Sequence, residues 1–122
     1  MTANRVFVND DGIIEIQVRG NQTVASVQAM GDKTVKLAEE LRAEGKRVMV
    51  LDNLLEMGIV PADARGRVVE LVRSNEYDKL AMLGSDTLLR FGANLILQAT
   101  GKGSRVKYFE DRERCITWLK KL

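Results

Sequence analysis

Acidic and small polar residues that could do chemistry follow three predicted strands of this chain. Asp52 comes directly after one apolar run, residues 84–86 (Gly-Ser-Asp) follow the next, and residues 110–111 (Glu-Asp) follow a third. Ligands of open α/β sheets bind outside the carboxyl ends of the strands, where paired carboxylates can perform acid–base catalysis or hold a hard cation. Turn and cap chemistry also explains every one of these residues without a site. We therefore predict no catalytic residue, no metal site and no cofactor here.

Two other features could support chemistry. Gly84 and Ser85 precede a predicted helix, so their backbone N–H groups could bind an anion, although no GxGxxG or Walker A pattern accompanies them. Cys115 shares a helical face with Leu119 and Leu122, which predicts a small core residue rather than a nucleophile. The chain contains no histidine, which excludes Ser–His and Cys–His catalysis and the usual zinc sites. These observations predict a protein that is not an enzyme.

Composition and charge predict one domain that spans residues 1–122. The hydrophobic share of 45% with 30% charged residues is typical of a globular protein. The 19 basic and 17 acidic residues are interspersed, with a net charge of +2, which argues against nucleic-acid binding. No apolar run reaches transmembrane length, and the first residues lack the charged and apolar regions of a secretory signal. Together with the single cysteine, these features predict a cytoplasmic location.

The elements that must position these residues are strands alternating with amphipathic helices. Turn residues at Asn9–Gly12 separate two short strands, which predicts a hairpin. A long helix is predicted over Thr23–Glu44, where Gly45 ends it. Unbroken apolar runs at 48–51 and 80–83 are typical of central strands covered on both faces. The predicted order is ββαβαβαβα, a single α/β domain with a mixed central sheet covered by four helices.

Several strings in this order resemble the SpoIIAA-like branch of the STAS domains. The matching segments are 50–52 (VLD), 77–84 (YDKLAMLG), and 105–111 (RVKYFED) followed by 115–119 (CITWL). The resemblance implies a STAS-type fold and a non-enzymatic module that binds a partner protein. In the best-understood STAS domains, phosphorylation of a serine at the start of the second helix switches this binding. Here the corresponding segment 58–64 (GIVPADA) has no serine or threonine, so we expect no such phosphoacceptor.

Two segments are more apolar than their predicted positions require. The segment 52–60, predicted as a loop between a strand and a helix, carries five large apolar residues. In the predicted third helix, apolar residues span about 240° of the circumference, whereas the last helix has an apolar arc of about 160°. Leu89, Ala93 and Leu97 form one stripe along an edge of the wide arc. A neighbouring helix, a second subunit, a partner protein or an apolar ligand could bury this excess.

The predicted function is a non-enzymatic regulatory or protein-interaction module. We expect its binding residues in the two apolar segments, and we expect self-association as a two-fold homodimer. The alternative is a binding protein or sensor for a small apolar or lipid-like ligand, since this branch also resembles the CRAL-TRIO lipid-binding domains in layout. A flat exposed patch would favour a partner, and a concave pocket would favour a ligand. The candidate partner- or ligand-binding residues are Leu54, Leu55, Met57, Leu89, Ala93 and Leu97.

Overall fold

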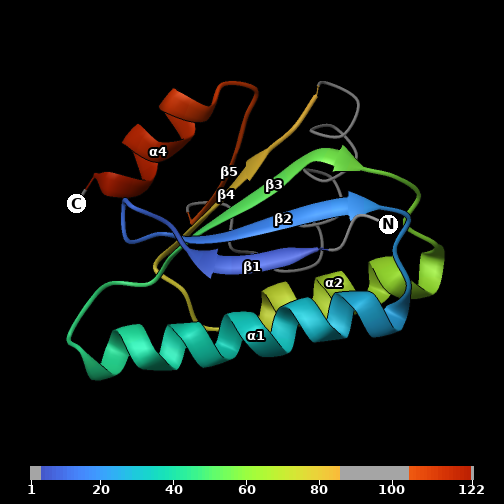
Figure 1. Cartoon of the computed structure of the whole chain (residues 1–122), viewed down its shortest axis with the longest axis horizontal. Helices are drawn as coiled ribbons and strands as arrows, with labels where there is room; N and C mark the ends of the chain where they lie inside the picture. Colours follow the sequence, from blue (N-terminus) through green and yellow to red (C-terminus); the bar gives the residue numbers. More distant parts are fainter. Residues whose placement is uncertain (1–3, 86–104, 122) are drawn as a thin grey trace.

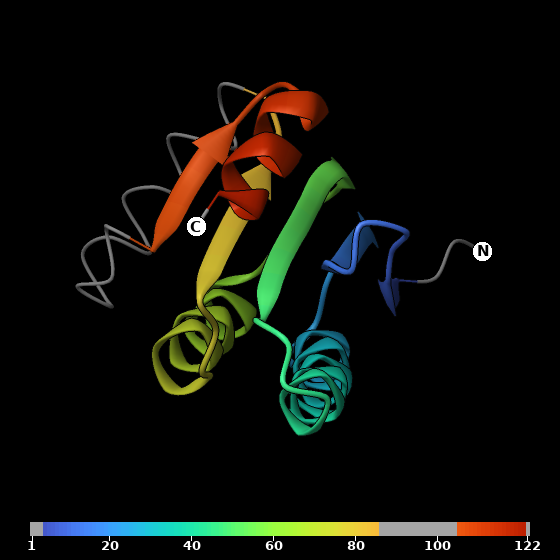
Figure 2. The same ribbon diagram turned by 90° about the vertical axis from the view of Figure 1, so that its left-hand side faces the viewer.

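A computed structural model of the chain describes residues 4–85 and 105–121. Along the described chain the elements are β1 (Arg5–Val8), β2 (Ile14–Gly20), α1 (Val24–Ala43), β3 (Met49–Met57), α2 (Ala62–Ser74), β4 (Lys79–Leu83), β5 (Val106–Phe109) and α4 (Arg112–Lys120). The sheet forms a central layer. Helices α1 and α2 cover one face of it, and helix α4 lies on the opposite face (Figures 1 and 2).

The sheet is mixed, as the sequence predicts. Its strand order is β1-β2-β3-β4-β5, in which β1 runs antiparallel to β2 and the other neighbours are parallel. The hairpin between β1 and β2 depends on Asn9, whose side-chain oxygen accepts hydrogen bonds from the backbone N–H groups of Asp11 and Ile13 at 2.9 and 3.1 Å. Gly12 supplies the positive φ of 76° in this turn. The predicted hairpin is confirmed.

Two apolar cores lie on opposite faces of the sheet. Val48 and Val50 belong to the core beneath α1 and α2, whereas Met49 and Leu51 belong to the core beneath α4. This alternation confirms that the run is a central strand covered on both faces. Cys115 of α4 is fully buried in the second core, so its interpretation as a core residue is also confirmed.

Helix α1 has the limits that its sequence predicts. Thr23 is the N-cap and forms a capping box with Ser26: each backbone N–H donates to the other side-chain oxygen, at 2.9 and 3.1 Å. Gly45 follows the helix with φ of 74°, which only glycine adopts without strain. Its buried face is built largely from small side chains, so it leaves space beneath the sheet. The buried residues are Val27, Gly31, Thr34, Ala38 and Leu41.

Strand β3 is longer than predicted. The interpretation of residues 52–60 as a loop is wrong in its first part, because the strand continues to Met57. Its register with β2 shifts between Gln17 and Arg19, so β3 holds one extra residue at that point. This β-bulge interrupts the alternation of side chains and lets Leu54 and Met57 both pack on the core beneath α1 and α2. The apolar residues of the segment are therefore largely strand residues.

Alanine substitutions at two glycines should change the free energy of unfolding in opposite directions. A Cβ at Gly58 would lie 2.9 Å from the backbone carbon of Gly20, whose carbonyl accepts the Gly58 N–H at 2.8 Å. We expect Gly58→Ala to lower the free energy of unfolding by about 1–3 kcal/mol, because backbone must shift. A Cβ at Gly66 in α2 would meet nothing within 4 Å, so Gly66→Ala should raise it by up to about 1 kcal/mol.

Urea unfolding of both variants tests this comparison, with the unfolding slope checked to be unchanged. A Gly58→Ala protein as stable as wild type would contradict the close approach of the two strand ends.

Candidate functional site

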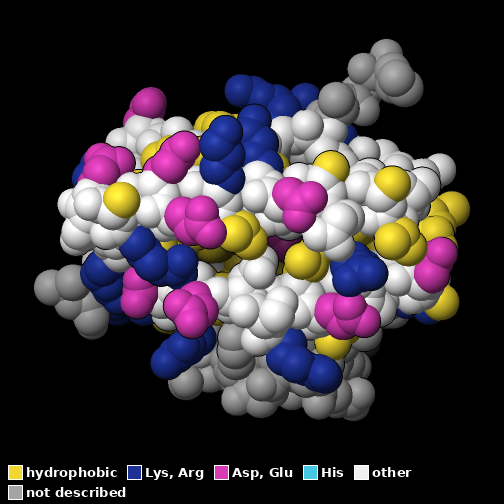
Figure 3. Space-filling view, turned by 90° about the horizontal axis from the view of Figure 1, so that it is seen from below, with side chains coloured by type: hydrophobic (Ala, Val, Ile, Leu, Met, Phe, Trp, Pro, Cys, Tyr) yellow, Lys and Arg dark blue, Asp and Glu magenta, His cyan; other side chains and the backbone are white. Residues whose placement is uncertain are grey.

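A cavity of about 360 Å³ lies between the sheet and helices α1 and α2. Its walls are mainly aliphatic, and each surrounding element contributes to them. Figure 3 views this face of the molecule and shows apolar side chains between the charged outer surfaces of the helices. The apolar lining includes Ile16, Val18, Val50, Leu54, Leu80 and Met82 from the sheet, Val27, Met30 and Ala38 from α1, and Val68, Leu71 and Val72 from α2.

The cavity exists because of the small residues on α1. A Cβ at Gly31 would lie 2.8 Å from the Leu71 side chain, so α1 and α2 touch at this point. Thr34 and Ala38 continue the same face of α1 and also line the cavity. Their short side chains leave the space between helix and sheet open, whereas interiors are otherwise packed nearly without voids.

One carboxyl group faces into this apolar space. Asp52 lies on β3 in register with Ile16 of β2 and Met82 of β4, and it lines the cavity. Its Oδ1 atom is buried and has no hydrogen-bond partner among the residues that the structure describes. The interpretation of Asp52 as a turn residue is therefore wrong, because β3 continues past it and aims it at the core. Burial raises the pKa of this carboxyl to about 7.

A tyrosine hydroxyl lies on the same face of the sheet, although its residue is not among those that line the cavity. Tyr108 of β5 lies in register with Met82, so its side chain is on the same face of the sheet as Asp52. Its hydroxyl oxygen is also buried and, within residues 4–85 and 105–121, without a hydrogen-bond partner. Burial and the nearby Asp52 carboxylate both raise the pKa of Tyr108. Two unsatisfied polar groups in an apolar setting are exceptional, since buried polar groups are normally hydrogen-bonded.

Charged residues border the cavity from the surrounding elements. Glu39 and Arg42 come from α1, Arg65 comes from α2, and Glu76 comes from the segment before β4. The Arg42 guanidinium donates to the backbone carbonyl of Glu76, and the Arg65 guanidinium donates to that of Val60 at 3.0 Å. These contacts direct both guanidinium groups toward backbone oxygens at the border of the cavity.

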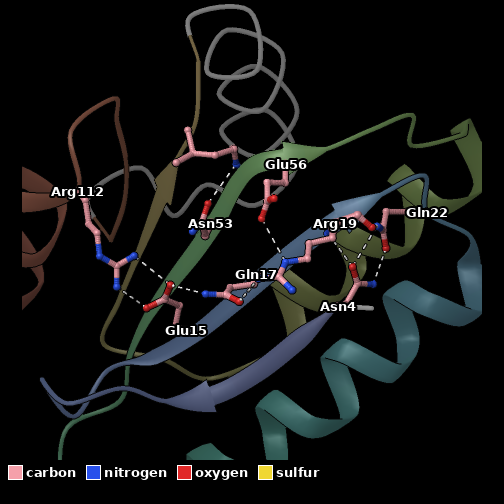
Figure 4. A network of polar contacts seen from close by, with 9 residues as sticks. Asn4, Glu15, Gln17, Arg19, Gln22, Asn53, Glu56 and Arg112 are labelled. Atoms are coloured by element: carbon pink, nitrogen blue, oxygen red, sulfur yellow. Dashed lines mark hydrogen bonds and ion pairs between the residues drawn. The ribbon is translucent and has the colours of Figure 1, made fainter. Parts of the chain in front are cut away.

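A second buried carboxylate, on the opposite face, has a structural role. Glu15 of β2 is 1% exposed and accepts hydrogen bonds from both terminal nitrogens of Arg112 at 2.6 and 3.0 Å (Figure 4). Burial alone would raise the Glu15 pKa, but hydrogen bonds from Arg112, Asn9 and Gln17 outweigh it and lower the pKa to about 2. This carboxylate is fully paired and ties α4 to the sheet.

The structure brings only part of the predicted site together. Leu54 and Met57 line the cavity, whereas Leu55 is 57% exposed. Leu89, Ala93 and Leu97, with the rest of the predicted third helix, lie outside the described residues. The sequence analysis did not predict that Asp52 and Tyr108 lie near each other on one face of the sheet. The available signal was the two-residue spacing that places Asp52 on the same strand face as Val48, Val50 and Leu54.

One of the two backbone N–H groups of the predicted anion site already has a hydrogen-bond partner. The Gly84 N–H donates to the carbonyl of Phe109 at 3.1 Å and is therefore already satisfied. Ser85 is exposed, and its role stays a prediction. Among residues 4–85 and 105–121, no group of three or more Cys, Asp or Glu side chains is arranged to hold a metal ion. Burial raises the pKa of the Cys115 thiol to about 12, so the reactive thiolate is disfavoured.

Comparison with known proteins identifies the fold. No protein-family model and no curated protein matches the sequence. The structure is similar to the crystal structure of an uncharacterized protein of the DUF3478 family with a SpoIIAA-like fold, from Shewanella loihica PV-4. The TM-score is 0.72 at 17% sequence identity, over 98% of this chain and 95% of that chain. The chain therefore has a SpoIIAA-like fold, as its sequence strings predict.

Within residues 4–85 and 105–121, no helix is both long enough and apolar enough to span a membrane.

Proposed function

We propose that this chain is a non-enzymatic binding protein for a small apolar molecule held between the sheet and helices α1 and α2. The observation that carries this proposal is the aliphatic cavity of about 360 Å³. Typical ligand pockets measure about 300–1,000 Å³ and combine apolar walls with a few polar groups. The Asp52 carboxyl, which lines the cavity, is the polar group nearest to this description. Of the two functions that the sequence leaves open, the concave cavity favours the ligand.

The polar groups of the cavity support binding rather than catalysis. The Asp52 Oδ1 atom has no hydrogen-bond partner in the described residues, whereas general acid–base or nucleophilic chemistry requires a second group positioned on the reacting atoms. The chain has no histidine to serve as that group. Cys115, the one thiol, is buried on the opposite face of the sheet.

A protein-interaction role is a second candidate, because apolar side chains also lie on the surface. Leu55 is 57% exposed and Ile59 is 70% exposed, both in the segment that the sequence predicts to contact a partner. Binding through these residues would not require the cavity. A ligand-binding experiment that reports on the cavity therefore separates the two candidates.

Titration with N-phenyl-1-naphthylamine, an uncharged apolar dye that fluoresces in dry surroundings, tests the cavity. We expect saturable binding to wild type. Ala38→Leu should weaken the dye affinity about tenfold or more, because the added atoms project into the cavity from α1. Ala43→Leu is the matched control: the same substitution at an exposed position of the same helix should leave the affinity unchanged.

Both variants are first shown to be folded by urea unfolding. Equal dye affinities for Ala38→Leu and Ala43→Leu would place the dye elsewhere and would contradict the proposed function.

A further inference from the structure

We propose that Asp52 makes this cavity selective for ligands that carry a positively charged amine on an apolar body. This inference rests on the proposed function and specifies the ligand class of the same site. The cavity holds a carboxyl group whose Oδ1 atom has no hydrogen-bond partner in the described part of the chain. A bound ammonium group would supply both the missing donors and the opposite charge.

The position of Asp52 explains why the residues that the structure describes do not satisfy it. Its cross-strand neighbours are Ile16 and Met82, which carry no donor. The cations that border the cavity, Arg42 and Arg65, donate to backbone carbonyl groups. Burial raises the pKa of Asp52 to about 7, and no charged side chain is among the causes of this shift. An ionised carboxylate in such surroundings is costly, and an incoming cation would offset that cost.

Tyr108 lies on the same face of the sheet as Asp52, although it is not among the residues that line the cavity. Its hydroxyl oxygen is buried and unpartnered within the described residues, and the Asp52 charge contributes to its raised pKa. The two side chains therefore lie within electrostatic reach on the same face of the sheet. An ammonium group donates hydrogen bonds in three directions, so the Asp52 carboxylate can accept at least one of them. An anionic head group would instead be repelled by Asp52.

The cavity volume limits the apolar body. About 360 Å³ lies near the lower end of the roughly 300–1,000 Å³ that is typical of ligand pockets, so the apolar body must be small. An eight-carbon chain with one head atom is a suitable probe. Octylamine, 1-octanol and octanoate each contain eight carbons, and their head groups are cationic, neutral and anionic at pH 8.

The experiment measures the displacement of N-phenyl-1-naphthylamine by these three compounds at pH 8. For wild type we expect octylamine to bind about 10- to 100-fold more tightly than 1-octanol, the range expected for a charge-assisted hydrogen bond, and octanoate to bind most weakly. Asp52→Asn should reduce the difference between amine and alcohol to about threefold or less while 1-octanol binding is retained. The control Asp32→Asn removes the same charge from the exposed side of α1 and should leave the order intact.

The possible outcomes distinguish a failure of the amine selectivity from a failure of the proposed function. Equal binding of octylamine and 1-octanol to wild type would overturn the selectivity while leaving the apolar cavity as a binding site. An amine preference that survives in Asp52→Asn would also overturn it, because another acidic group would then be responsible. If none of the compounds displaces the dye, or the dye does not bind, both the selectivity and the proposed function fail. The order of affinities on wild type is a test that needs no variant to fold.

Discussion

Replacing Asp52 with leucine should stabilise the ligand-free protein at pH 8.5, although the residue lies in the centre of the sheet. Burial raises the pKa of this carboxyl from 3.8 to about 7, so at high pH the folded protein must hold a buried charge that no group in residues 4–85 and 105–121 compensates. At about 1.4 kcal/mol per pKa unit, ionisation costs the folded state on the order of 4 kcal/mol. Leucine has a similar shape and no charge to bury.

The pH dependence of this effect has a defined sign. Because the folded-state pKa of Asp52 is raised, the folded state holds its proton more tightly than the unfolded state does between pH 3.8 and about 7. The stability that this group contributes is present below pH 3.8 and is lost as the pH rises to about 7. The advantage of Asp52→Leu over wild type should therefore grow by about 3 kcal/mol between pH 5 and pH 8.5.

Urea unfolding of wild type and Asp52→Leu at both pH values measures this change. The exposed Asp32→Leu serves as the control and should show no comparable growth with pH. A constant difference between Asp52→Leu and wild type at pH 5 and pH 8.5 would show that Asp52 titrates normally in the folded protein. That result would also remove the desolvation cost that a bound ammonium group is proposed to offset.

Arg112→Ala should produce the largest loss of stability among the surface positions of α4. The substitution leaves the Glu15 carboxylate, whose side chain is 2% exposed, without its bidentate partner. Breaking a buried ion pair typically costs about 3–5 kcal/mol, and we expect about 2–4 kcal/mol here because the Arg112 side chain is 46% exposed to water. Arg114→Ala on the same helix should cost less than about 0.5 kcal/mol, since that side chain is 82% exposed.

The stability lost in Arg112→Ala should depend on pH. The contribution of the Glu15 carboxyl to stability disappears at low pH, whereas that of the Asp52 carboxyl disappears at high pH. The pKa of Glu15 is lowered to about 2 in the folded state, so its stabilising contribution is present above pH 4.5 and is lost as the pH falls toward 2. The difference between wild type and Arg112→Ala should therefore be largest at pH 7 and smaller at pH 3.5. Urea unfolding at these two pH values measures it.

A double variant tests whether the penalty comes from the unpaired charge. Replacing both partners, with Glu15→Leu and Arg112→Met, should recover most of the stability that Arg112→Ala loses. If the double variant is as unstable as Arg112→Ala, the loss comes from packing of the Arg112 side chain rather than from the buried carboxylate.

Local chemistry in the sequence determined most of the elements of this fold. Asn9 and Gly12 specify the hairpin, because their side-chain and backbone preferences act within the turn itself. Thr23 and Gly45 define the limits of α1 by capping, which also involves only neighbouring residues. The apolar run at 48–51 predicts a strand covered on both faces, because alternate side chains must each meet a core.

The tertiary structure alone decided what Asp52 does. An acidic residue after an apolar run is typical of a strand end, and only the pairing of β3 with β2 and β4 shows that the strand continues. The same pairing places Tyr108 on its face, through a register that depends on β4 lying between the two strands. The ion pair of Glu15 and Arg112 likewise joins residues 97 positions apart.

The cavity is also a property of the assembled layers rather than of any one segment. Small residues at Gly31, Thr34 and Ala38 are compatible with a tightly packed helix, and the sequence contains no direct measure of the distance between α1 and the sheet. That distance follows from the apolar side chains on both layers, and the contact of Gly31 with Leu71 shows how closely α1 approaches α2. Secondary structure follows from interactions between near neighbours, whereas a cavity and the pKa of a buried carboxyl depend on how distant surfaces meet.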